Sequence, residues 1–274
     1  MAIKNILVAF NGSEASENAL LVAAQMQRKY DAHVTGLLAH EGQRDKFASR
    51  PWVPENVREI IETAVQSEET RLEARFREML GTAPHDKLHW FTLAATPDST
   101  VAQYACMYDI TIVGRHMANE PAETSLHPER IAMKAGRPVL VVPPCDLDPS
   151  FINKPTVLAW DGARAATRAM NDAMLILETK QRVDVLSVGT NVRPPLEGID
   201  VVKALGRHGV NALRVRREKG ARRIGDAILE YCDEIGAGLL VMGAFEHSMF
   251  RQELFGGTTM SVLQNAKTPV LISH

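Results

Sequence analysis

Residues 239–274 read LLVMGAFEHSMFRQELFGGTTMSVLQNAKTPVLISH and contain the pattern that decides the fold. The run LLVM is apolar and continuous, which is typical of a strand buried in a parallel sheet. A glycine follows it at position 243, and a long loop then leads to two further glycines at 256 and 257. A short helix pattern and a last apolar run, PVLIS, complete the stretch. Strand, glycine loop, helix and strand in this order predict a loop whose backbone amides can hold a phosphate.

The order of elements in this stretch occurs twice in the chain. The matching segments are ILVAFNG (6–12) with TVLAWDG (156–162), and AGRPVLVV (135–142) with AKTPVLIS (266–273). An internal repeat of about half the chain predicts two domains of one fold rather than a solenoid. We expect these domains to span residues 1–144 and 155–274, joined by the proline-containing segment 143–155.

Short apolar runs alternate with helical patterns throughout both halves. This alternation predicts an α/β protein with two tandem doubly wound domains, each built on a five-stranded parallel sheet. Ser13 is expected to cap the first helix and Pro97 to open a later one. A long amphipathic helix is expected between residues 55 and 80, with its apolar face formed by Val57, Ile60, Ile61, Ala64, Leu72, Phe76 and Leu80. In such sheets ligands bind beyond the carboxyl ends of the strands, where the winding direction reverses.

The composition is that of a globular protein without a strong charge bias. Of the 274 residues, 45% are hydrophobic and 23% are charged, and the formal net charge is −2. We therefore expect neither a nucleic-acid partner nor a membrane partner, and an N-terminus that enters a strand pattern directly indicates no signal peptide. Cys106, Cys145 and Cys232 are odd in number and widely spaced, which fits a reducing cytoplasm. We expect all three to be small core residues.

The repeated segments resemble the universal stress protein family in its tandem two-domain form. The resemblance rests on the opening and closing segments above and on TIVGR (111–115) and LVMGA (240–244), and it covers essentially the whole chain. It implies Rossmann-like domains of the adenine nucleotide alpha hydrolase-like type. Because family members often dimerise through their closing strands, it also implies an internal pseudo-dimer of the two domains and a further homodimer of two chains.

The resemblance also implies a nucleotide site in the second domain. In members that bind ATP, the loop after the fourth strand reads Gly-x-x-Gly, nine residues, then Gly-Ser or Gly-Thr. This chain keeps the spacing, but Glu246 replaces the second glycine and Gly257 replaces the hydroxyl residue, for which the following threonines could substitute. The site residues carried over onto this chain, with ATP as the candidate ligand, are Asp161, Gly243, Gly256, Gly257, Thr258 and Thr259.

The first domain departs further from the family's pattern. Gly114 begins the corresponding loop, but no glycine occurs from 115 to 135, and Asn11 replaces the acidic residue of the first strand. The loop is also two residues shorter than its counterpart, judged by the distance from its first glycine to the proline of the closing strand. We expect this domain to be structural or to hold a different ligand.

Glu246 decides how the second domain is interpreted. Two unit charges about 4 Å apart interact by roughly 4 kcal/mol at an effective dielectric constant of 20, so an unrelieved carboxylate would weaken phosphate binding about a thousandfold. Arg251 or His247 could partly neutralise it, or it could face solvent. Three alternatives therefore remain open: retained nucleotide binding, a loop kept only as scaffold, and another small acidic or apolar ligand.

Three other features have a functional and a structural interpretation. The run RVRREKGARR (214–223) predicts either an anion-binding rim or a solvated strand edge. Phe47 and Trp52, in the irregular segment 41–54, could cover a cleft or pack between domains. Four histidines show no metal-ligand or catalytic spacing, so we expect surface or loop positions for them: His116, His127, His247 and His274.

The sequence thus predicts a cytoplasmic binding or regulatory module of the stress response that is not an enzyme. The rival hypotheses are a slow ATPase of the second domain and a purely structural interaction protein that binds no nucleotide.

Overall fold

Strands and helices alternate along both halves of the chain, as the sequence predicts. The computed structural model describes residues 2–41, 53–118, 120–145, 150–190, 192–194, 196–244 and 257–274. The first half contains β1 (Asn5–Ala9), α1 (Glu14–Tyr30), β2 (His33–His40), α3 (Glu55–Met79), η1 (His85–Lys87), β3 (Leu88–Ala94), α4 (Pro97–Ala105), β4 (Ile110–Gly114), α5 (Pro128–Ala135) and β5 (Val139–Val142). The second half contains η2 (Phe151–Asn153), β6 (Thr156–Ala159), α6 (Arg164–Asp172), α7 (Met174–Leu177), β7 (Val183–Val188), α8 (Val201–Arg207), β8 (Ala212–Arg217), α9 (Ile224–Glu234), β9 (Leu239–Gly243), α10 (Thr258–Asn265) and β10 (Val270–Ser273).

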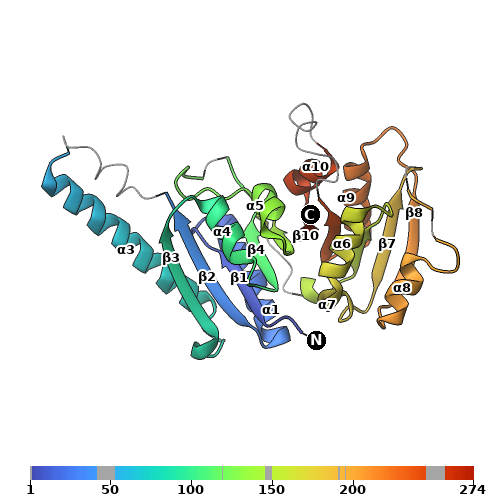
Figure 1. Cartoon of the computed structure of the whole chain (residues 1–274), viewed down its shortest axis with the longest axis horizontal. Coiled ribbons are helices and arrows are strands. Elements are labelled where there is room, and N and C mark those ends of the chain that lie inside the picture. The colour runs from blue at the N-terminus through green and yellow to red at the C-terminus, as the bar shows by residue number, and fades with distance from the viewer. Residues whose placement is uncertain are drawn as a thin grey trace.

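All the named strands belong to one sheet, in the order β3-β2-β1-β4-β5-β10-β9-β6-β7-β8 (Figure 1). Neighbouring strands are parallel within each half, and the winding direction reverses between β1 and β4 and between β6 and β9. The two halves meet through β5 and β10, which pair in the antiparallel direction with Leu140 opposite Leu271. The expected α/β fold and the internal pseudo-dimer are both confirmed.

Each face of the sheet is covered by helices from both halves. One apolar core lies under α1, α3, α6, α7 and α8, and the other lies under α4, α5, α9 and α10. Leu140 and Leu271 face the first core, whereas Val139 and Ile272 face the second. Each core therefore continues across the β5–β10 junction, so that the two halves share apolar packing on both sides of the sheet.

Side chains of each half also bind the backbone of the other. Nη1 of Arg115, just after β4, donates to the carbonyl oxygens of Gln264 (2.8 Å) and Ala266 (3.1 Å) at the end of α10. Nη2 of Arg168 on α6 lies 3.4 Å from the carbonyl oxygen of Gly136 at the end of α5. These carbonyl oxygens lack partners within their own helices, so the arginines act as caps supplied by the opposite half.

Two local predictions are confirmed, and two hold only in part, since Leu72, Phe76 and Leu80 of the expected helix face are buried. Ser13 caps α1 by accepting a hydrogen bond from the backbone N–H of Ser16, and Pro97 is the first residue of α4. Ile60 on the expected core face of α3 is 67% exposed, because the N-terminal part of this helix extends beyond the sheet (Figure 1). Cys106 is exposed as well; Cys232 is the fully buried cysteine, and burial raises the pKa of its thiol to about 12.

The glycines that end β4 and β9 allow a helix to pass unusually close to the sheet. A Cβ atom at Gly243 would lie 2.4 Å from the carbonyl carbon of Ala165 in α6, and one at Gly114 would lie 2.5 Å from that of Ala15 in α1. Both contacts are with backbone, which cannot move aside without shifting a helix. Glycine at 243 therefore has a packing cause that is independent of any phosphate.

We expect Gly243→Ala and Gly114→Ala each to lower the free energy of unfolding by about 1–3 kcal/mol, because the added methyl group overpacks the helix contact. Gly206→Ala in α8 is the matched control, since a Cβ atom there meets nothing within 4 Å. The control should be neutral or stabilising by up to about 1 kcal/mol. Urea denaturation of the variants measures these differences, and equal effects at all positions would contradict the packing argument.

Lys180 is a buried cation next to the segment that joins the halves. Its side chain is only 7% exposed, and Nζ lies 2.6 Å from the carbonyl oxygen of Ile152 and 3.3 Å from that of Lys154. Burial, with a smaller contribution from the charge of Lys29, lowers the pKa of Lys180 from 10.5 to about 7. The unfolded chain therefore binds a proton that the folded chain releases between about pH 7 and pH 10.5.

Because the unfolded state holds more protons in this window, stability should rise with pH. We expect Lys180 to contribute about 2 kcal/mol more to the free energy of unfolding at pH 9 than at pH 7, at 1.36 kcal/mol per pKa unit. Lys180→Met, which keeps the apolar stem but cannot titrate, should lose most of this difference. Denaturant unfolding of both proteins at the two pH values is the measurement; an unchanged pH dependence in the variant would refute the assignment.

Candidate functional site

A cavity of about 690 Å³ opens at the carboxyl ends of the strands in the second half. It is lined from β6 and the residues after it, from the ends of β7 and β9, and from the first turns of α9 and α10. This position coincides with the reversal of winding between β6 and β9, where a doubly wound sheet leaves a crevice. The volume falls in the range of small-molecule sites in proteins.

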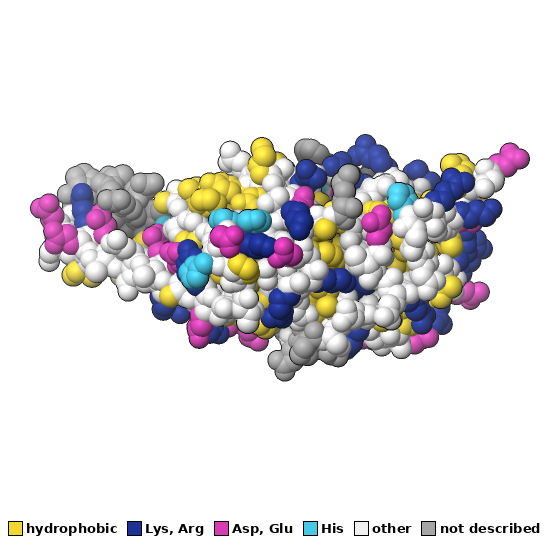
Figure 2. Space-filling model, turned by 90° about the horizontal axis from the view of Figure 1, so that it is seen from below, with side chains coloured by type: hydrophobic (Ala, Val, Ile, Leu, Met, Phe, Trp, Pro, Cys, Tyr) yellow, Lys and Arg dark blue, Asp and Glu magenta, His cyan; other side chains and the backbone are white. Residues whose placement is uncertain are grey.

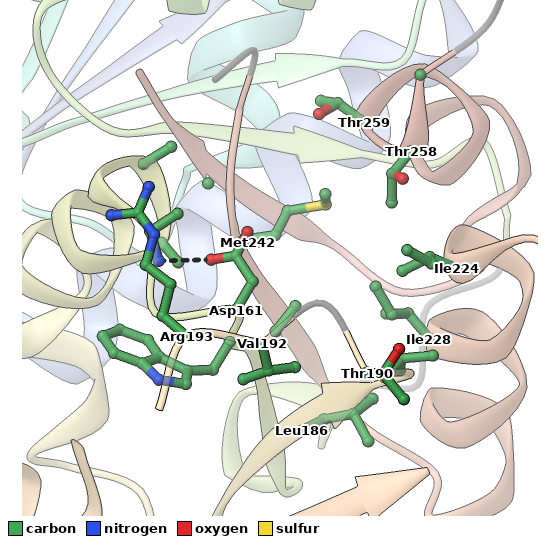
Figure 3. A pocket seen from close by; sticks show the side chains of 18 residues that line it. Asp161, Leu186, Thr190, Val192, Arg193, Ile224, Ile228, Met242, Thr258 and Thr259 are labelled. Carbon is green, nitrogen blue, oxygen red and sulfur yellow. Dashed lines mark hydrogen bonds between the residues drawn. The ribbon is translucent and has the colours of Figure 1, made fainter. Parts of the chain in front are cut away.

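The floor of the cavity is apolar, and its polar groups lie at the margins. The apolar lining consists of Ala159, Trp160, Ala163, Ala165, Ala166, Leu186, Val188, Val192, Ile224, Ile228 and Met242. Figure 3 shows Asp161 and Arg193 on one side of the cavity and Thr258 and Thr259 on the other, with Thr190 near Ile228. An apolar floor with a few polar groups at its edge suits a ligand with a flat apolar body and a polar or charged end.

Asp161 is held by the turn that follows β6. Its Oδ1 accepts a hydrogen bond from the backbone N–H of Ala163 at 2.9 Å, and its carbonyl oxygen accepts one from the N–H of Arg193 at 2.8 Å. The carboxylate is thus fixed at the cavity edge while remaining exposed. Asn11 makes the equivalent turn in the first half, where its Oδ1 accepts from the N–H of Ser13 at 3.1 Å.

The start of α10 supplies donors on the opposite side. Gly257 occupies the N-cap position, so the N-cap residue itself has no side chain that could cap the helix. Thr258 and Thr259 follow it directly, and both line the cavity. The first N–H groups of the helix and the two hydroxyl groups can therefore donate to an anion or a polar ligand at this edge.

The described structure brings five of the six predicted site residues together around the cavity. They are Asp161, Gly243, Gly257, Thr258 and Thr259. The sixth, Gly256, lies outside the described residues, as do Glu246, His247, Arg251, Phe47 and Trp52, so the effect of the Glu246 carboxylate stays a prediction from the sequence.

The corresponding edge of the first half is bonded to its own chain. Nδ2 of Asn11 donates to the carbonyl oxygen of Thr124 at 2.9 Å, and the N–H of Glu41 donates to that of Glu123 at 2.8 Å. Leu126 is buried in the core below. The loop before α5 is thereby fastened to the ends of β1 and β2. The equivalent strands of the second half are β6 and β7, and their ends border the cavity there. An aspartate at position 11 would lack the N–H donor of this contact.

The histidines of this loop bind groups of the first half. Nδ1 of His127 lies 3.0 Å from Oδ2 of Asp98, whose Oδ1 accepts from the backbone N–H of His127. The ring of His116 stacks on that of His127, with centroids 4.4 Å apart, and its Nδ1 lies 3.1 Å from Oγ of Ser125. No group of three or more His, Cys, Asp or Glu side chains among the described residues is arranged to hold a metal ion.

The run of arginines on and after β8 is partly neutralised. Arg214 pairs with Asp200 at 2.7 Å, Arg217 pairs with Glu234 at 2.6 Å, and Arg222 pairs with Glu230. Figure 2 shows Lys and Arg side chains gathered toward the end of the molecule that carries α8 and β8. The ion pairs favour the interpretation as a solvated strand edge for these three arginines, because each has its own carboxylate.

Sequence reasoning singled out none of the other lining residues, among which Trp160, Thr190 and Arg193 carry polar or aromatic groups. Trp160 and Thr190 come within two residues of the ends of β6 and β7, so the rule that ligands lie beyond the carboxyl ends of strands could have found them, whereas Arg193 lies farther along the chain from β7. Arg193 stands in the segment NVRPP (191–195), which carries no recognised binding motif.

Comparisons with known proteins agree with the fold described above. The model of the universal stress protein family matches residues 2–143 and 161–274. A universal stress protein from Archaeoglobus fulgidus has a crystal structure with a TM-score of 0.70 at 15% identity, over 98% of this chain and 95% of that one. A functionally unknown protein from Pseudomonas aeruginosa gives a TM-score of 0.55 at 15% identity, over 99% of this chain and 92% of that one.

No curated protein sequence matches the chain. Among the helices of the described residues, none is both long and apolar enough to cross a membrane. The match of the family model to both halves covers most of the chain. The chain therefore belongs to the universal stress protein family and carries two of its domains in tandem.

Proposed function

We propose that the second half binds an adenine nucleotide, with ATP as the first candidate, and that the protein is a non-enzymatic regulatory module of the stress response in the cytoplasm. The first half is its structural partner. The single observation that carries this proposal is the cavity between the ends of β6 and β9, which has an apolar floor and polar margins.

The chemistry of the cavity supports a nucleotide over a wholly apolar ligand. Leu186, Val188 and Met242 offer apolar surface to a flat base, whereas Thr258 and Thr259 offer hydroxyl groups where α10 begins. Phosphate groups favour such a position because the N-terminus of a helix presents free N–H donors and a partial positive charge.

The lining favours binding over hydrolysis. Asp161 is the one carboxylate among the described lining residues, and its Oδ1 already accepts a hydrogen bond from the turn at Ala163. No histidine occurs among those lining residues. A general base must reach the water that attacks the phosphate, and Asp161 lies across the cavity from Thr258, where the phosphates are proposed to lie (Figure 3). Incubation of the pure protein with ATP, followed by chromatography for ADP, separates binding from slow hydrolysis.

Family members often dimerise through the edges of their closing strands. In this chain the two closing strands, β5 and β10, are already paired with each other. A homodimer of two chains, if formed, must therefore use other surfaces, and it stays a prediction from the resemblance.

Titration calorimetry with ATP and magnesium tests the proposed site directly. Thr190 is exposed at the cavity edge, so Thr190→Trp should place a large ring over the opening without repacking the core. We expect the wild type to bind one nucleotide and this variant to lose at least tenfold in affinity. Thr63→Trp on the exposed face of α3 is the matched control and should bind like the wild type. Equal binding by all three proteins would place the ligand elsewhere.

The sequence-based argument about Glu246 gives an independent prediction. Glu246→Gly should raise the affinity for ATP at least tenfold, which corresponds to about 1.4 kcal/mol. The substitution removes the repulsion between the Glu246 carboxylate and the phosphates, of which solvent screening leaves only a part. Gly256→Val should abolish binding by filling the space beside the phosphate. Calorimetry measures both variants. If the wild type binds no nucleotide and Glu246→Gly gains none, the loop is a scaffold turn.

A further inference from the structure

The first turn of α10 lines the cavity, whereas the rest of this helix leads toward the first half. The helix has eight residues, and Thr258 and Thr259 at its start are lining residues. Figure 1 shows α10 near the middle of the molecule, where the two halves join, and Figure 3 shows its two threonines at the cavity edge. A helix of about two turns is marginal by its own hydrogen bonds, so its order depends on the groups that it contacts.

The C-terminal end of α10 is held by side chains from outside the second half. Nη1 of Arg115 donates to the carbonyl oxygens of Gln264 at 2.8 Å and Ala266 at 3.1 Å. Sγ of Cys145, just after β5, lies 3.4 Å from the carbonyl oxygen of Lys267, which follows the helix. The bonds from Arg115 have a charged donor, and such bonds are stronger than those between neutral groups. Arg115 is therefore the main contact that fixes this end of α10 to the first half.

The common fold does not require an arginine at this place. The N–H of Arg115 donates to the carbonyl oxygen of Val142 at 2.7 Å, and the N–H of Ala244 donates to that of Ser273 at 2.9 Å. Arg115 and Ala244 are thus counterparts, because each follows the glycine that ends the fourth strand of its half and bonds to the closing strand. Ala244 is fully buried. The arginine belongs to the first half alone, yet it acts on the half that has the cavity.

The reciprocal contact between the halves lies away from the cavity. Nη2 of Arg168 in the second half lies 3.4 Å from the carbonyl oxygen of Gly136, at the end of α5. Neither Arg168 nor any residue of α5 is among the described residues that line the cavity. Two arginines thus bind helix ends across the junction, and only Arg115 binds a helix that begins at the cavity. The pair separates an effect on the site from an effect on the junction.

We propose that Arg115 is a positioning residue for the nucleotide site of the other half, and that it holds the end of α10 so that the first turn stays in place for the phosphate groups. This inference rests on the nucleotide binding proposed above. It gives the first half a part in controlling affinity, because a change there that moves Arg115 also loosens α10. By linkage, a nucleotide bound at the start of α10 strengthens the contact between Arg115 and the end of the helix.

Calorimetry with ATP and with adenosine on the wild type and three variants tests the proposal. We expect Arg115→Gln to weaken ATP binding roughly fivefold or more and adenosine binding by less than about twofold, because the base lies on the floor formed by strands and the phosphates lie at α10. Arg115→Lys should fall between the two proteins for ATP, since lysine keeps the charge without the planar fork. Arg168→Gln is the matched control and should bind both compounds like the wild type.

Hydrogen exchange gives a second measurement that needs no ligand. The N–H of Ser261 donates to the carbonyl oxygen of Gly257, and the N–H of Ala266 donates to that of Val262. Both amides should exchange faster in Arg115→Gln than in the wild type, because the helix opens more often without its cap. Arg168→Gln should leave their exchange unchanged.

The possible results separate this inference from the proposed function. Unchanged ATP binding in Arg115→Gln, equal losses for ATP and adenosine, or the same losses in Arg168→Gln would overturn the role of Arg115 while leaving nucleotide binding intact. Unchanged exchange in α10 would also overturn it. A wild type that binds neither compound would overturn the proposed function and this inference with it. Thermal unfolding confirms that each variant is folded at the temperature of the titration.

Discussion

The antiparallel pairing of β5 with β10 is the interaction on which the rest of this structure depends. It joins two five-stranded sheets into one and lets both apolar cores continue from half to half. An unpaired edge strand is a hazard in any sheet, and here each closing strand protects the other within the same chain. Because the two halves are covalently linked, the effective concentration of each edge for the other is high.

This permanent pairing lets the halves differ without loss of the fold. The second half keeps a cavity edged by Asp161 and Arg193. In the first half, the amide of Asn11 binds the carbonyl oxygen of Thr124, and Leu72 of α3 packs against Gly12. A carboxylate in place of the Asn11 amide would lose the donor of that contact. In the first half, which has Asn11 after β1, the loop before α5 is fastened to its own sheet. In the second half, which has Asp161 at the equivalent position after β6, there is a cavity.

The sequence predicted the features that follow from periodicity and repetition. The continuous apolar runs and their recurrence indicated the parallel sheets, and the resemblance to the family implied the pairing of PVLVV with PVLIS. It did not predict that Ile60 would be exposed, because helical periodicity cannot tell where a helix outruns the sheet beneath it. It also missed Arg193, whose place at the cavity depends on a backbone contact with Asp161 that no local motif records. Glycine at 243 suggested phosphate binding, whereas the close approach of α6 accounts for it by packing.

The central claim is that one half of this tandem protein holds a ligand while the other is fastened to its own chain. A crystal structure of the protein grown with ATP and magnesium tests this most directly. The account predicts electron density for one nucleotide in the cavity between the ends of β6 and β9, and none at the ends of β1 and β4. Density for a nucleotide at the first half, or at neither half, would contradict it.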